Sequence, residues 1–99
     1  MILEDRYLER CRTIAKEIKG VLGARRTLFL SMIGEYGAVG ATKRLVHADQ
    51  PSDTFVELML RQRLDLTVEW IITNEPEWDA LFTDADRTAA KNRLGKSHP

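Results

Sequence analysis

The sequence predicts an all-α fold, a compact single-domain bundle of five to six short helices over residues 1–99. Apolar residues recur at intervals of three and four along most of the chain, which is the period of a helix face. No segment alternates apolar and polar residues over the length of a strand. Residues that start and stop helices are frequent, and they divide the chain into short pieces. Residues 96–99 form a polar tail.

The first predicted helix spans residues 3–19. Its apolar positions lie on one face, namely Tyr7, Cys11, Ile14, Ile18 and Val21. Gly20 and Gly23 follow, and glycine readily adopts the left-handed conformation found just past a helix end. We interpret Cys11 as a small core residue, because a reactive thiol needs an electropositive and partly open site.

Two further helices, over residues 24–36 and 38–47, are predicted to meet at a glycine corner. Gly34, Gly37 and Gly40 lie at this junction, and we interpret them as a corner where two helix backbones approach closely. Their spacing differs from the G-x-G-x-x-G fingerprint of a dinucleotide-binding loop, and a helix rather than a strand precedes them. Phosphate binding is therefore not expected here.

The next two helices each carry a residue suited to capping. Ser52 or Asp53 begins the fourth helix, and Asp65 begins the fifth by accepting a backbone N–H bond two or three residues on. Residues 66–72 are rich in β-branched and aromatic side chains, so a strand is the main alternative there. The cap and the i, i+4 spacing of apolar residues favour a helix.

Two more caps are expected towards the C-terminus. Pro76 opens a short helical turn, where its missing N–H would be unpaired in any case. Thr83 caps the last helix, and Asp86 completes a variant of the capping box. This helix runs to Leu94 and ends at Gly95. The predicted core draws on all helices: Tyr7, Ile14, Ile18, Phe29, Met32, Ile33, Leu45, Phe55, Leu58, Val68, Ile71, Ile72, Leu81 and Phe82.

Composition argues against several classes of function. The 15 basic and 15 acidic residues give zero net charge, so no overall field attracts nucleic acid or a membrane. One cysteine and no signal peptide predict a cytoplasmic protein, and no stretch approaches the roughly 20 apolar residues of a membrane span. Neither histidine has a neighbour at ligand spacing, and no nucleophile–base motif is present. We therefore expect no enzyme activity, no metal and no cofactor.

The zero net charge hides an uneven distribution. Residues 6–26 carry seven basic and two acidic side chains, whereas residues 75–86 carry five acidic and no basic ones. Two interpretations remain open. The segments are solvated helix faces that oppose each other, or they are complementary patches that attract a partner or a second copy.

Residues 38–47 and the preceding glycine corner also have the proportions of a helix-turn-helix. The residues that would contact DNA are Thr42, Lys43 and Arg44, supported by Arg25 and Arg26. One position does not fit the motif, because Lys43 stands where a buried residue is usual. We expect Lys43 and Arg44 to be solvated charges, with no specific DNA binding at physiological salt.

An ordered series of motifs resembles a family of small, uncharacterised, all-helical bacterial and phage proteins. The motifs lie at residues 28–32, 40–45, 51–55, 63–69, 76–83 and 93–94. The likeness is most specific at residues 63–69, which read Arg-Leu-Asp-Leu-Thr-Val-Glu. It implies a bacterial or mobile-element origin, and it carries no activity with it.

The sequence thus favours a non-enzymatic, cytoplasmic protein-interaction or accessory module. Its candidate contacts with an unknown partner or a second copy are Arg63, Trp70 and Trp78. For Arg63 we nevertheless predict a structural role, through a bond to a helix-end carbonyl or to a carboxylate such as Glu69. The alternative function is a helix-turn-helix-like nucleic-acid-binding protein that uses residues 38–47.

Overall fold

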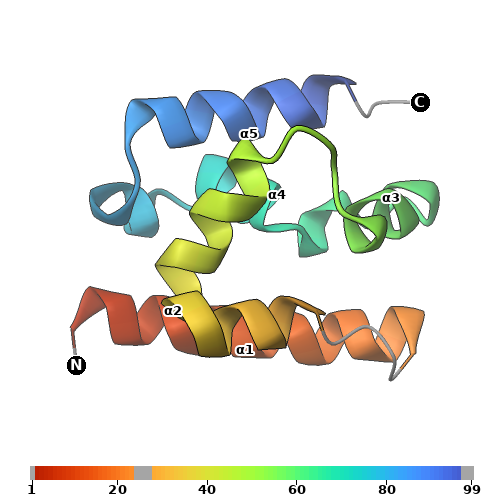
Figure 1. Cartoon of the computed structure of the whole chain (residues 1–99), viewed down its shortest axis with the longest axis horizontal. Coiled ribbons are helices and arrows are strands. Elements are labelled where there is room, and N and C mark those ends of the chain that lie inside the picture. Colours follow the sequence, from red (N-terminus) through yellow and green to blue (C-terminus); the bar gives the residue numbers. More distant parts are fainter. Residues whose placement is uncertain (1, 24–27, 97–99) are drawn as a thin grey trace.

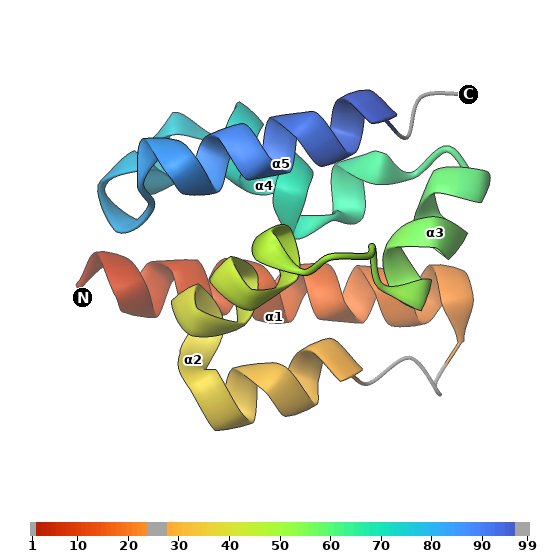
Figure 2. The same ribbon diagram turned by 45° about the horizontal axis from the view of Figure 1, so that its top comes forward.

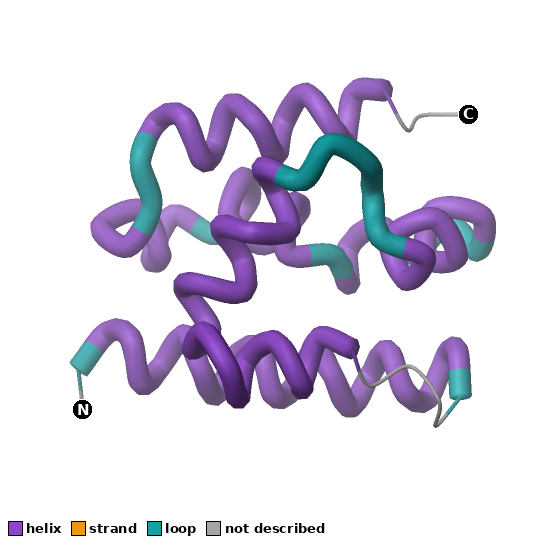
Figure 3. The backbone as a smooth tube through the Cα atoms, viewed as in Figure 1, coloured by secondary structure: helices purple, strands orange, loops and turns teal. Residues whose placement is uncertain are grey.

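The computed structural model of the protein describes residues 2–23 and 28–96, and these form helices without a strand (Figures 1 and 3). The elements are α1 (Leu3–Leu22), α2 (Leu28–His47), α3 (Asp53–Leu60), η1 (Leu64–Leu66), α4 (Val68–Asn74), η2 (Pro76–Leu81) and α5 (Asp84–Lys96). The predicted all-α class is therefore confirmed. Residues 66–72, with their high β propensity, lie in the short 3-10 turn η1 and in α4.

The helices are arranged in layers, and α1 and α5 form the two outer layers. In Figure 1, α1 lies along the bottom and α5 along the top, with the short elements α3, α4 and η2 between them. The first part of α2 lies alongside α1, and its second part crosses towards α5, as the turned view of Figure 2 also shows. α2 thereby contacts both α1 and α5.

α2 consists of two helical arms joined at Gly37, which has φ 76° and ψ 167°. This is the left-handed region of φ that favours glycine, so the predicted corner forms where the sequence places it. The expected close approach is found at one of the three glycines only, because outside the neighbouring residues and the helix's own backbone no atom lies within 4 Å of the Cβ position at Gly34 or Gly37. Of the three corner glycines, only Gly40 is crowded, by Tyr36 Cβ at 3.1 Å. The corner depends on the backbone conformation of Gly37.

The hydroxyl of Thr67, and not the carboxylate of Asp65, caps α4. Thr67 has extended backbone angles, and its Oγ1 accepts the N–H of Trp70 at 3.1 Å. Asp65 lies inside η1, and its carboxylate binds the Arg63 guanidinium at 3.1 and 3.2 Å. The prediction for Asp65 is wrong because a 3-10 turn intervenes before the helix. Arg63 binds a carboxylate as expected, but the partner is Asp65 and not Glu69.

The other predicted helix ends agree with the structure to within a few residues. Ser52 caps α3 by accepting the N–H of Phe55 at 3.1 Å. Thr83 and Asp86 form a reciprocal capping box, with bonds of 2.9 and 3.1 Å. α1 continues through Gly20 to Leu22, and α5 continues through Gly95 to Lys96. A glycine inside a helix is tolerated when its neighbours continue the packed face.

The core is centred on Tyr7 and the inner faces of α1, α4 and η2. The buried apolar residues of the main cluster are Tyr7, Cys11, Ile14, Ile18, Ala38, Val46, Leu58, Leu66, Val68, Ile71, Ile72, Trp78, Phe82 and Ala90. Five predicted core residues are only partly buried: Phe29, Met32, Ile33, Leu45 and Leu81. Three of these lie on the first arm of α2, which packs against the rest of the molecule along one side only. The expectation that Cys11 is a core residue is confirmed.

The corner at Gly37 generates a test with a control in the same helix. Gly37→Ala should lower the free energy of unfolding by about 1–2 kcal/mol, because a Cβ is strained at this φ. Gly34→Ala, at an open helical position, should raise it by up to about 1 kcal/mol. Urea denaturation measures both changes. Equal effects of the same sign would contradict the special role of Gly37.

The cap of α4 generates a second test. Thr67→Ala should lower the free energy of unfolding by about 1–2 kcal/mol, because the N–H of Trp70 loses its acceptor. Thr67→Ser keeps the hydroxyl and should recover most of this loss. Asp65→Ala removes a partly exposed ion pair and should cost less than about 1 kcal/mol. Thermal melts would reject the assignment if Asp65→Ala were the more damaging change.

Candidate functional site

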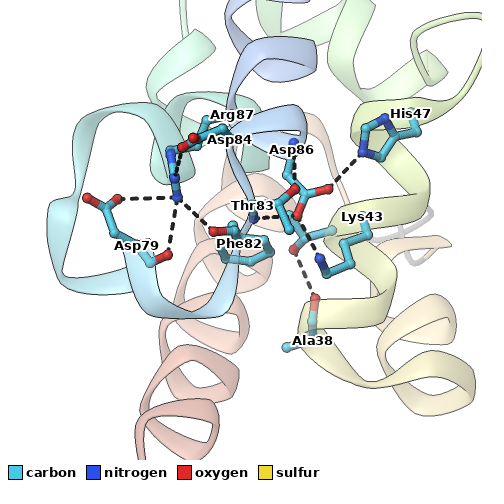
Figure 4. Close-up of polar contacts among 10 residues, drawn as sticks. Ala38, Lys43, His47, Asp79, Phe82, Thr83, Asp84, Asp86 and Arg87 are labelled. Atoms are coloured by element: carbon cyan, nitrogen blue, oxygen red, sulfur yellow. Dashed lines mark hydrogen bonds and ion pairs between the residues drawn. The ribbon is translucent and has the colours of Figure 1, made fainter.

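Asp86 joins α5 to the second arm of α2 through a cluster of short polar contacts (Figure 4). Lys43 Nζ donates to Oδ2 at 2.6 Å, and His47 Nε2 lies 2.8 Å from Oδ1. The backbone N–H of Thr83 donates to Oδ2 at 2.9 Å. The Asp86 side chain is only 5% exposed, so these partners replace the water that it gives up on folding.

The charge of Asp86 is stabilised by these bonds. Burial on its own would raise the pKa of this carboxyl group. The hydrogen bonds from Lys43, from the Thr83 N–H and from His47 outweigh burial and hold the pKa well below its ordinary value. The carboxylate is therefore charged throughout the physiological pH range, and Lys43 is bound to it. The expectation that Lys43 is an ordinary solvated charge is wrong.

A histidine beside a buried carboxylate can belong to a catalytic dyad, so the surroundings of His47 matter. A hydrolytic site also needs a nucleophile within reach of the other ring nitrogen. Among residues 2–23 and 28–96, no hydroxyl or thiol forms a hydrogen bond with His47, whose side-chain partner is Asp86. Cys11 is fully buried, and burial raises the pKa of its thiol to about 11. Within residues 2–23 and 28–96, no three His, Cys, Asp or Glu side chains cluster as a metal site would require. This geometry fits a structural joint.

The two segments of opposite charge face each other within the molecule. Arg10 binds Glu75 through two bonds of 3.1 and 2.7 Å, and Arg6 binds Glu77 at 3.1 Å. The bonds from Arg10 lower the pKa of Glu75, against the opposing effect of burial. Glu75 also accepts the indole N–H of Trp78 at 2.9 Å. These acidic side chains thus already have basic partners on α1, in agreement with the first interpretation of the charge pattern.

A second buried ion pair, between Glu69 and Arg93, lies at the C-terminal end of α2. Arg93 Nη1 donates to the carbonyl of Leu45 at 2.6 Å, and Nη2 donates to the carbonyl of Ala48. Its guanidinium lies 3.7 Å from Glu69 Oε2. Burial raises the pKa of Glu69, and the nearby Arg93 opposes that effect. Arg93 therefore acts as a side-chain cap for the carbonyls at the C-terminal end of α2.

The hollows of the molecule differ in size and position. Glu69 borders a largely apolar cavity of about 40 Å³ between α1, α2 and α3. That volume is far below the ~300 Å³ of a typical ligand pocket. Two larger surface hollows, of about 510 and 500 Å³, lie on either side of Met59. Trp70 borders the second of these, together with Leu64 and Leu94.

The first arm of α2, residues 28–36, exposes large apolar side chains to solvent. Leu28 is 59% exposed, Leu30 is 45% exposed and Tyr36 is 40% exposed. None of residues 28–37 is buried. The guanidinium of Arg44 lies 3.8 Å from the centre of the Tyr36 ring. This cation–π contact holds the Tyr36 side chain at the C-terminal end of the exposed arm.

The residues proposed from the sequence for DNA contact do not form one outward-facing set. Thr42 is fully buried, and its Oγ1 lies 2.7 Å from the hydroxyl of Tyr7. Lys43 points to Asp86, and Arg44 lies over Tyr36. Arg25 and Arg26 lie outside the described residues.

Two of the three candidate partner-binding residues remain accessible. Arg63 and Trp70 are partly exposed. Trp78 is buried, and its ring packs edge-on to Tyr7 at 5.2 Å, so its proposed exposure is wrong. The exposed arm at residues 28–36 was missed, although its sequence carried a signal. Apolar residues occur around most of the helix circumference there, and only part of that circumference can face one core.

The contribution of the Asp86 charge to stability can be tested by substitution. Asp86→Asn should lower the free energy of unfolding by about 1.5–3 kcal/mol at neutral pH, because Lys43 loses its anionic partner. The folded-state pKa lies below the unfolded value, so the unfolded chain takes up the proton first as the pH falls. The stabilisation is therefore present above about pH 4–5 and is lost in acid.

Denaturation series at several pH values check this prediction. The difference between Asp86→Asn and the parent chain should shrink as the pH falls below about 4. Asp84→Asn, an exposed carboxylate in the first turn of the same helix, is the matched control and should cost less than about 1 kcal/mol. If the difference in free energy of unfolding between Asp86→Asn and the parent chain stayed constant down to low pH, the charge of Asp86 would not be what stabilises these contacts.

The comparisons with known proteins give no relative from which a role could be transferred. No family model, no curated protein and no solved structure matches the chain. In the part of the chain that the structure describes, no helix combines the length and apolar character needed to cross a membrane.

Proposed function

We propose that this chain is a non-enzymatic, cytoplasmic protein-interaction module, and that it contacts its partner through the first arm of α2. The observation that supports this proposal is the exposure of Leu28, Leu30 and Tyr36 on one short helix. Large apolar side chains that gather on a surface are typical of protein-interaction sites.

The arrangement of the arm suits recognition by a helix or a groove. Leu28, Met32 and Tyr36 follow one another at i, i+4 and i+8, so they form a single ridge along the helix. Phe29 and Ile33 lie beside this ridge and pack against the core. The inner side chains hold the arm in place, while the ridge offers apolar anchors at the spacing that helix-in-groove complexes use.

The nucleic-acid alternative has less support. Its contact set would need Thr42 and Lys43 to point outward, and both are engaged with other parts of the fold. No other described feature favours that function. The expected lack of specific DNA binding stays a prediction, and a fluorescence-anisotropy titration at physiological salt can check it.

A photo-crosslinking experiment tests the proposed interaction surface. A benzophenone side chain at position 28, on the exposed ridge, should form a specific product with a protein in an extract of the producing cells. The same group at Ala85, an exposed position on α5, is the matched control and should form none.

The captured protein is then purified and titrated. Leu28→Asp should weaken its binding at least ~10-fold, as expected when an apolar anchor is replaced by a charge, with an unchanged melting temperature. Products that were the same at positions 28 and 85, or a titration insensitive to Leu28→Asp, would count against the proposed surface.

A further inference from the structure

The surface hollow beside Trp70 lies apart from the first arm of α2, because α3, η1, α4, α5 and the turn after α3 supply the residues that border it. Its volume is about 500 Å³, within the range of roughly 300–1,000 Å³ that small-molecule sites occupy. Met59, Leu64 and Leu94 form its apolar side, together with the ring of Trp70. The hollow thus has the size and the apolar surface that the body of a small molecule needs.

The hollow carries no unpaired charge among the described residues. Asp65 is the one charged side chain that borders it. The guanidinium of Arg63 binds this carboxylate at 3.1 and 3.2 Å and so neutralises it. Because an unpaired charge is costly to bury, the hollow suits an uncharged ligand.

Trp70 and Asn74 place a donor and an acceptor on one wall of the hollow. In the part of the chain that the structure describes, the indole N–H of Trp70 donates to no acceptor, whereas that of Trp78 donates to Glu75 at 2.9 Å. Asn74 Nδ2 donates to the carbonyl of Trp70 and to Thr73 Oγ1, both at 3.0 Å, and its Oδ1 accepts no bond from a described residue. Trp70 and Asn74 stand four residues apart on α4, so their side chains are neighbours on one helix face.

Gln62 brings a side-chain amide to the hollow at a strained position. Its φ is 60°, and among the described residues it is the only one other than glycine with a positive φ. The N–H of Gln62 donates to the carbonyl of Met59 at 3.0 Å, and that of Arg63 to the carbonyl of Leu58 at 2.8 Å. This is the Schellman ending of a helix, where glycine is favoured. The exposed Gln62 amide bonds to no other described residue, so the fold itself does not use it. Strained residues gather at binding sites, where the side chain has a use of its own.

We propose that this hollow binds an uncharged ring compound with a lactam edge, which is a carbonyl beside an N–H in the same ring. The ligand carbonyl accepts from the Trp70 indole, and the ligand N–H donates to Asn74 Oδ1. The Gln62 amide adds a bond from the turn after α3, and the ring packs against Met59 and Leu64. A peptide group is trans, with its N–H and C=O on opposite sides, so it does not meet both partners on one wall. This site is independent of the proposed function of the arm.

NMR of the nitrogen-labelled chain tests this inference with carbostyril, an uncharged bicyclic lactam. The chain has two tryptophans, so its spectrum holds two indole N–H signals, and Trp70→Phe assigns them. Carbostyril titrated up to about 5 mM should shift the Trp70 signal to saturation. The signal of the buried Trp78 should stay in place.

Gln62→Gly separates binding from stability. Loss of a hydrogen bond to the ligand should weaken carbostyril binding about fivefold. The same substitution should raise the melting temperature, because glycine adopts this φ without strain. Gln50→Ala is the matched control, since it removes an exposed side-chain amide that borders the other hollow beside Met59. It should leave the Kd of carbostyril within about twofold of the parent value.

Four results would overturn the inference. The first is a Trp70 signal that does not move over this concentration range. The second is a Gln62→Gly chain that melts at a higher temperature and binds carbostyril as tightly as the parent. The third is equal binding of N-methylcarbostyril, which lacks the ring N–H. The fourth is equal binding of acetanilide, an open-chain trans amide, because the hollow would then recognise a peptide-like group and not a lactam edge.

Discussion

The buried hydroxyl of Tyr7 connects the helices that define this fold. It lies 2.7 Å from Thr42 Oγ1, and Thr42 in turn donates to the carbonyl of Ala38 at 2.9 Å. The Tyr7 ring packs edge-on against Trp78 and Phe82, each with centroids 5.2 Å apart. Burial raises the pKa of Tyr7 well above its ordinary value, so the phenol stays protonated. One side chain thus links α1, the second arm of α2 and the η2–α5 segment.

The orientation of the second arm of α2 follows from this contact. Since Thr42 faces inward, the next residue, Lys43, is turned towards α5 and reaches Asp86, while Arg44 extends back over Tyr36. The side chains that resemble a DNA-reading set from their order in the sequence are therefore divided among three different environments. The fold uses Thr42 and Lys43 internally, and the first arm of α2 remains exposed.

Some contacts between residues close in sequence could be predicted, whereas the specific partners of distant residues could not. The capping box of Thr83 and Asp86 depends on a spacing of three residues, which the sequence displays directly. Asp65 and Thr67 are both good acceptors, and the choice between them depends on a 3-10 turn that local propensity does not specify. The bonds from Lys43 to Asp86 and from Arg93 to the end of α2 join residues far apart in the chain. Only the packing of whole helices brings them together.

The partly exposed residues of the first arm show a limit of reasoning from apolar periodicity. Phe29, Met32 and Ile33 were predicted to be core residues because they recur at helical intervals, and none of them is fully buried. Periodicity identifies the face of a helix, but not whether a second element covers that face. In this chain none of the described elements packs over the outer side of the arm, and its exposed apolar side chains identify it as a surface.

Gly37 gives the arm a direction different from that of the rest of α2, while Phe29 and Ile33 pack it against the core. The helix direction changes at this residue, so the ridge of Leu28, Met32 and Tyr36 lies on a segment that contacts the rest of the molecule along one side only. The Tyr7 contacts, the Asp86 joint and the Arg93 cap all lie beyond that corner. Changes to exposed arm residues therefore leave the interactions that stabilise the fold in place. A loss of binding in such variants can be attributed to the surface itself when their melting temperature is unchanged.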